Sequence, residues 1–199
     1  MSKIHRKIIQ LVYLRGRGCV FTPKDFIGVG SRMAIDTTLS RLAAAGHIRR
    51  LARGLYDYPK RHRLLGDLYP SLDDVAKTIA RDADSKLQIS GANALHVLGL
   101  TTQVPAQIIY LTDGQSKNIQ IGRATLVLKH ASSKVMAASG SKVGMILQAI
   151  RYLGKSSLDD HFFKKITPQL NHQDKKILKH VMRFAPQWAK PAIDQLLAA

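Results

Sequence analysis

The sequence predicts an α+β protein, in which an N-terminal winged helix-turn-helix is followed by a mixed α/β domain that ends in helices. Three observations predict this class. Helical and strand-like patterns both occur along the 199 residues. The first 63 residues have the order helix, short helix, glycine turn, helix and hairpin. The last sixty or so return to helical spacing. We therefore expect domains at 1–63 and 64–199.

The first two helices are predicted from apolar spacing and from the residues that begin and end them. In residues 3–15 the apolar residues recur at helical spacing: Ile4, Ile8, Leu11, Val12 and Leu14. Thr22-Pro23 predicts the start of a second helix, because a hydroxyl caps the N-terminus and proline is tolerated at the first helical position. Gly28 and Gly30 end this helix within two turns.

A third helix and a hairpin complete the winged helix-turn-helix pattern. Ser31 caps the helix, which runs to Ala45 and is closed by a glycine. Residues 48–51 and 55–58 are expected to form two short strands that meet at Arg53-Gly54. In this arrangement the third helix enters the major groove of DNA and the hairpin forms the wing.

The charge of the chain supports a nucleic-acid partner. Lys and Arg total 31 against 13 acids, all of them Asp, which gives a formal net charge of +18. Residues 1–63 hold 14 Lys and Arg but three Asp, and the other 136 residues hold 17 and ten. An excess of this size repels itself unless a polyanion neutralises it, and nucleic acid is the common intracellular polyanion.

The predicted DNA contacts lie on the third helix, the turn before it and the wing. The outward side chains of the third helix, apart from two arginines, are compact and allow close approach to base edges. Asp36 among them has two open roles: accepting from a cytosine amino group or orienting an arginine. The full predicted set is Thr22, Lys24, Ser31, Arg32, Thr37, Ser40, Arg41, Arg49, Arg50, Arg53, Lys60 and Arg61.

From residue 64 onward the pattern is mixed. An amphipathic helix is predicted over 72–83, and a short strand with a small-residue helix over 86–99. Strands are expected at 107–112, 118–121 and 124–130, followed by four helices. Lys175, Lys176, Lys179 and Arg183 share one face there, either as solvated residues or as a partner-binding surface.

No catalytic or metal-binding pattern is found in the sequence. The chain has no Glu, no convincing carboxylate pair and a single cysteine, Cys19, which is expected to be a small buried residue rather than a nucleophile. No apolar run approaches the ~20 residues needed to span a bilayer. We expect a cytoplasmic protein that is not an enzyme, with no cofactor and no membrane partner.

Three stretches carry a resemblance to a known family: FTPKDF at 21–26, RRLARGLYDYP at 49–59 and ISGANALHVLGLTTQVPAQIIYLTDG at 89–114. They resemble the AbiEi-type antitoxins of bacterial abortive-infection (type IV) toxin–antitoxin systems. The similarity covers nearly the whole chain and becomes loose after about residue 140.

The resemblance implies a winged helix-turn-helix that binds inverted repeats in its own promoter and represses transcription. It also implies that the second domain counteracts a nucleotidyltransferase-type toxin, without requiring a stable complex. We expect a monomer or weak dimer that pairs on DNA. Two alternatives stay open: a regulator without a toxin partner, and an RNA-binding or nucleic-acid-processing protein.

Overall fold

The computed structural model describes residues 3–105 and 107–198, and it is an α+β fold with a helical C-terminal region, as the sequence predicted. The chain divides into two compact units. The first contains Met1–Asp84 and Asn118–Leu126, and the second contains Ser85–Lys117 and Val127–Ala199. Across the described residues, no helix has the length and apolar character to cross a bilayer.

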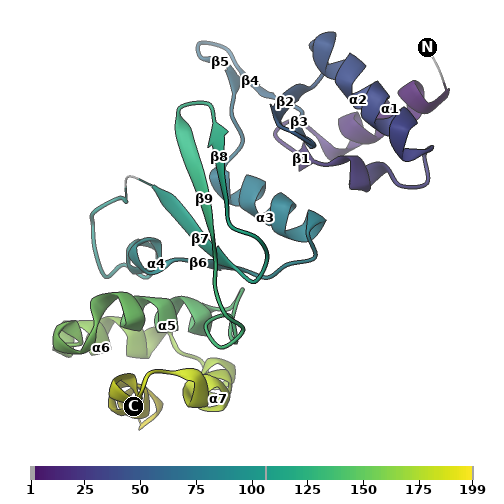
Figure 1. Ribbon diagram of the computed structural model, residues 1–199. Helices are drawn as coiled ribbons and strands as arrows, with labels where there is room; N and C mark the ends of the chain where they lie inside the picture. The colour runs from purple at the N-terminus through teal and green to yellow at the C-terminus, as the bar shows by residue number, and fades with distance from the viewer. Residues whose placement is uncertain (1–2, 106, 199) are drawn as a thin grey trace. The chain divides into compact units, whose positions relative to one another are not determined.

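The first unit begins with two α-helices, labelled in Figure 1, and a 3-10 helix between them. They are α1 (Lys3–Arg15), η1 (Pro23–Phe26) and α2 (Arg32–Ala44). The predicted starts of η1 and α2 are confirmed: η1 has proline in its first turn, and the Ser31 hydroxyl accepts the N–H of Ala34 at the start of α2. The buried core contains Ile8, Val12, Phe21, Phe26, Ile35, Leu39, Leu42, Ile48 and Tyr56.

A three-stranded antiparallel sheet covers this core. Its strands are β1 (Val20–Phe21), β2 (Arg49–Ala52) and β3 (Leu55–Asp57), in the order β1-β3-β2. The predicted hairpin is confirmed to within a residue or two at each end. Strand β1 was not predicted, since two residues are too few to show alternation.

A second hairpin and a third α-helix follow in the same unit. The hairpin consists of β4 (Lys60–His62) and β5 (Gly66–Leu68) and extends away from the three-stranded sheet (Figure 1). It was also not predicted, because its strands are mostly polar and show no apolar alternation; all of their residues except the partly buried Leu68 are exposed. Helix α3 (Leu72–Asp82) is capped by Ser71 and confirms the predicted helix.

The second unit contains the remaining elements, apart from residues 118–126. A four-stranded sheet is formed by β6 (Leu87–Ile89), β7 (Ile108–Thr112), β9 (Ala124–His130) and β8 (Lys117–Ile121), in that order. The helical elements are α4 (Gly91–Val97), α5 (Lys142–Leu153), η2 (Lys155–Ser157), α6 (Asp160–Ile166), η3 (Thr167–Gln169), α7 (His172–Val181), η4 (Met182–Phe184), η5 (Gln187–Ala189) and α8 (Lys190–Ala198).

Helix α5 is the centre of the second core. Val143, Ile146 and Ala149 are fully buried, and α4, α6, α7 and α8 contribute to the same cluster. Gly91 is needed where α4 meets α5: a Cβ there would lie 2.3 Å from the Cβ of Tyr152. Gly91, within the Ser90-Gly91-Ala92 start of the third resembling stretch (89–114), therefore has a packing role.

Candidate nucleic-acid interface

Helix α2 presents a polar face to solvent and an apolar face to the core. Ile35, Leu39 and Leu42 are buried, as the helical spacing predicted. Thr37 and Ser40 are exposed, so two of the predicted base-reading residues are accessible. The intervening Thr38, in contrast, is buried and donates its hydroxyl to the Ala34 carbonyl at 2.7 Å.

Two arginines border this face. Arg32 and Arg41 are both exposed. The Arg32 Nε atom lies 2.9 Å from Oδ2 of Asp36, one helical turn away, while 61% of the Arg32 side chain stays exposed. Of the two roles left open for Asp36, this contact is the orienting one: the carboxylate holds the guanidinium group over the outer face of α2.

The arginines of the β2–β3 hairpin differ in their surroundings. Arg50 and Arg53 are exposed. Arg49 turns inward, because successive residues of a strand face opposite sides. Its Nε and Nη2 atoms donate to both carboxylate oxygens of Asp57, at 3.0 and 2.6 Å. Arg49 therefore has a structural role in the hairpin, and its predicted contact with DNA stays a prediction.

The Arg49–Asp57 pair is the best-buried ion pair of the first unit, with side chains 22% and 1% exposed. Burial raises the pKa of the Asp57 carboxyl, and the two hydrogen bonds from Arg49 oppose that rise. Arg49 also donates to the Leu68 carbonyl at 2.7 Å and lies over the Tyr69 ring, 4.0 Å from its centroid. One guanidinium group thus joins β2, β3 and the end of β5.

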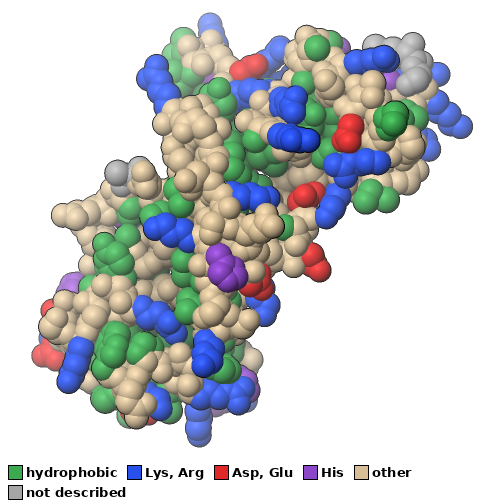
Figure 2. Space-filling view, viewed as in Figure 1, with side chains coloured by type: hydrophobic (Ala, Val, Ile, Leu, Met, Phe, Trp, Pro, Cys, Tyr) green, Lys and Arg blue, Asp and Glu red, His purple; other side chains and the backbone are tan. Residues whose placement is uncertain are grey.

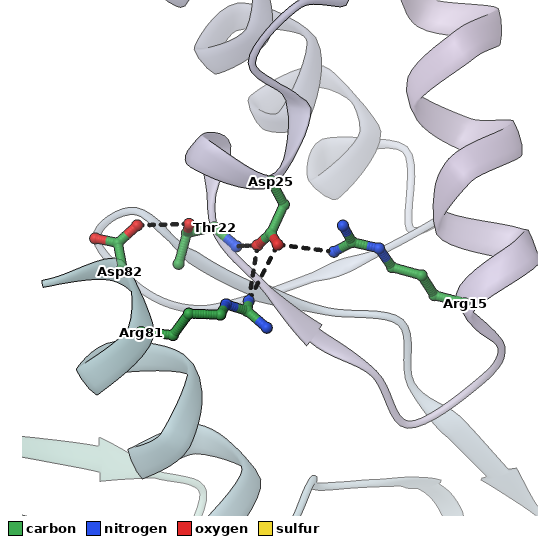
Figure 3. A network of polar contacts seen from close by, with 5 residues as sticks. All are labelled: Arg15, Thr22, Asp25, Arg81 and Asp82. Carbon is green, nitrogen blue, oxygen red and sulfur yellow. Dashed lines mark hydrogen bonds and ion pairs between the residues drawn. The ribbon is translucent and has the colours of Figure 1, made fainter. Parts of the chain in front are cut away.

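Two further predicted contacts are engaged within the unit. Thr22 is 4% exposed and donates its hydroxyl to Oδ1 of Asp82 at 2.6 Å (Figure 3). The Lys24 ammonium group donates to the backbone carbonyl of the same Asp82. Because η1 packs beside the end of α3, Thr22 is not available to a ligand, which corrects its predicted role. Ser31 remains exposed as the cap of α2.

Asp25 is the centre of a network that joins α1, η1 and α3. Its carboxylate lies 3.2 Å from Nη1 of Arg15 and 3.1 Å from Nη2 of Arg81, and it accepts the N–H of Thr22 at 2.8 Å (Figure 3). Through these contacts α3 belongs to the first compact unit. The unit consequently extends to Asp84, past the boundary that the sequence predicts after residue 63.

Replacing Asp25 by alanine is expected to destabilise the first unit by about 1–2 kcal/mol, since the change removes a capping acceptor and leaves two arginines without a shared partner. The single cysteine reports this unit alone. Burial raises the pKa of the half-buried Cys19 thiol, so the thiol reacts slowly while the unit is folded. Its alkylation becomes faster when the unit unfolds, and the rate at increasing urea concentrations therefore measures unfolding. In the control, Asp36→Ala, a half-exposed helix pair is lost and a change of about 0.5 kcal/mol is expected. Equal effects of the two changes would contradict the assigned role of Asp25.

The remaining predicted cations lie on the β4–β5 hairpin. Lys60 and Arg61 are exposed, and Arg61 makes an open ion pair of 3.4 Å with Asp67 on the opposite strand. The accessible members of the predicted set in the first unit are thus Ser31, Arg32, Thr37, Ser40, Arg41, Arg50, Arg53, Lys60 and Arg61, with Lys24 exposed but bonded to Asp82.

Comparison with protein-family models gives one match, a family of unknown function designated DUF6088, over residues 7–178. The chain belongs to the DUF6088 family. The match begins within α1 and ends within α7, so α2, both hairpins of the first unit and most of the second unit are parts of DUF6088. A search of curated proteins finds no match.

The positive charge of this DUF6088 protein is shared by its two units. The first holds 17 Lys and Arg with eight Asp, and the second 14 with five, so each has a net charge of +9. The first unit is less positive than residues 1–63 alone, because residues 64–84 add five Asp against two cations. Lys and Arg side chains outnumber those of Asp on the face of the molecule in Figure 2.

Within the described residues, no group of three or more His, Cys or Asp side chains is arranged to hold a metal ion.

Proposed function

We propose that this DUF6088 protein is a DNA-binding transcriptional regulator whose first unit is a winged helix-turn-helix. In this proposal α2 enters the major groove and β2–β3 is the wing. The observation that carries it is the outer face of α2, where the accessible Thr37 and Ser40 lie between Arg32 and Arg41.

Physical chemistry supports this assignment of roles. Short hydroxyl side chains let a helix backbone approach base edges, and arginine binds guanine edges or phosphates. Arg50 and Arg53 supply exposed cations on a hairpin of the same compact unit, where they would contact phosphates beside the groove. The order α1, β1, η1, α2, β2, β3 supports the proposal, because a winged helix-turn-helix places its hairpin after such a series of helices.

The regulated DNA and the second activity follow from the resemblance to the AbiEi-type antitoxins. We propose that the protein binds inverted repeats in its own promoter, represses that promoter and counteracts a nucleotidyltransferase-type toxin through its second unit. A regulator of the same kind without a toxin partner is the alternative. Co-expression with the product of an adjacent nucleotidyltransferase gene separates the two, because antitoxin activity restores growth and a regulator alone does not.

Binding to DNA is tested by fluorescence anisotropy with a duplex from upstream of the gene and a scrambled duplex of equal length. We expect tighter binding to the upstream duplex, and affinity for both falls as salt rises, by about 0.9 in logarithmic slope for each phosphate contact. Arg41→Ala is expected to reduce the preference between duplexes by roughly 1–3 kcal/mol. Equal affinity for the two duplexes would contradict sequence-specific binding.

A further inference from the structure

The tip of the β4–β5 hairpin exposes two large apolar side chains. Leu64 and Leu65 are 85% and 71% exposed, and they follow one another at the end of a hairpin that extends away from the sheet β1-β3-β2 (Figure 1). Single exposed leucines are common on protein surfaces, but an adjacent pair at the end of a projection is the kind of feature that a partner covers.

The base of this hairpin is held in place from both sides. At its start, Nη1 of Arg17 donates to the Pro59 carbonyl at 2.9 Å, and Pro59 is buried. At its end, Nη2 of Arg49 donates to the Leu68 carbonyl at 2.7 Å. Because both arginines bond backbone atoms, they fix where the two strands leave the unit.

The turn at the tip also has a defined shape. The backbone N–H groups of Leu64 and Leu65 both donate to Nδ1 of His62, at 3.3 and 3.2 Å. Gly66 completes the turn with φ of +70°, a conformation that favours glycine. The two leucines are therefore presented by a turn whose backbone is held by hydrogen bonds.

The charges around the leucines indicate the class of partner. Lys60, Arg61 and Arg63 are exposed on the same hairpin, against one carboxylate, that of Asp67. A second copy of the chain would bring the same cations together, and two leucines bury far less than the ~1,000 Å² expected of a stable interface. The partner must therefore attract cations and also offer an apolar space for two leucines. Duplex DNA, with charged phosphates outside and stacked bases inside, does both.

We propose that the β4–β5 hairpin is a DNA wedge, in which Leu64 and Leu65 insert at a base step from the minor groove while the flanking cations bind the phosphates. Proteins that bind the minor groove use apolar side chains in this way and unstack one step at a cost of a few kcal/mol. Removing the leucines from water and gaining phosphate contacts offset that cost. This inference rests on the proposed DNA-binding function and adds a second contact region to it.

The test places 2-aminopurine, whose fluorescence rises when it is unstacked, at successive positions of the upstream duplex. With the full-length protein we expect the fluorescence to rise at one step or two adjacent steps of each bound site. The double variant Leu64→Ser/Leu65→Ser should lose this rise while its affinity for DNA changes by less than about tenfold, since the cost of unstacking is lost together with the gain from burial.

The matched control is Leu14→Ser, which removes a leucine of α1 that is 83% exposed in the same unit. This variant should keep both the affinity and the fluorescence rise. Binding of the parent protein with no rise at any position would overturn the wedge and leave the proposed function intact. Failure of the parent protein to bind any duplex would overturn both.

Discussion

Replacing Arg50 and Arg53 together by alanine is expected to weaken binding to every duplex, whatever its sequence. Both side chains are exposed on the β2–β3 hairpin, where the proposed wing contacts phosphates rather than bases. Each lost phosphate contact reduces the dependence of log affinity on log salt by about 0.9. The slope should therefore fall by about 2 in anisotropy titrations at several salt concentrations.

A matched variant separates this local effect from a general loss of charge. Lys164 and Lys165 are exposed on α6 of the second unit, and replacing both by alanine lowers the net charge by the same amount. The α6 variant should keep most of the parent's slope and its preference between upstream and scrambled duplexes. If the two double variants lost affinity equally, the β2–β3 hairpin would have no special contact with DNA.

Replacing Asp57 by alanine is expected to cause the largest loss of stability among single changes of a charged residue in the first unit. The carboxylate is 1% exposed, and its removal leaves the half-buried Arg49 without its bidentate partner. Breaking a buried pair from one side costs roughly 3–5 kcal/mol, and the partial exposure of Arg49 places this case near 3 kcal/mol. Urea unfolding followed by Cys19 alkylation measures the change in the first unit, and Trp188 fluorescence follows the second.

Asp67 supplies the comparison for this prediction. Its ion pair with Arg61 is open to solvent, with side chains 69% and 50% exposed, so Asp67→Ala should change stability by less than about 1 kcal/mol. We expect Asp57→Ala to weaken DNA binding as well, because Arg49 holds both the β2–β3 hairpin and the base of β4–β5. A stable Asp57→Ala protein would show that Arg49 has no structural role.

Much of the fold follows from local chemistry in the sequence. Helix α2 was predicted because Ser31 can cap it, Ile35, Leu39 and Leu42 share one face, and Gly46 can end it. In the structure Gly46 does adopt the left-handed conformation that closes the helix. The strands β7, β8 and β9 and the C-terminal helices were likewise found from their periodicity.

The assignment of individual side chains was less accurate, because it depends on contacts between distant segments. Arg49 and Arg50 are two adjacent arginines, and nothing in the sequence distinguishes them. Only the structure shows that Arg49 is the one that pairs with Asp57. Thr22 was taken for a DNA contact because Asp82, its partner sixty residues later, is not visible in a local pattern. The β4–β5 hairpin was missed because its two strands contain a single apolar residue, Leu68, and so show no alternation of apolar and polar residues.

The central claim, that the outer face of α2 enters a groove of DNA, is tested most directly by affinity cleavage. In a Cys19→Ser background, Thr37→Cys carries an iron–EDTA group, and the full-length protein is bound to the upstream duplex. We expect strand cleavage confined to a few base pairs within each inverted repeat. Bound protein that cleaves the duplex evenly, or cleaves it nowhere near the repeats, would contradict it.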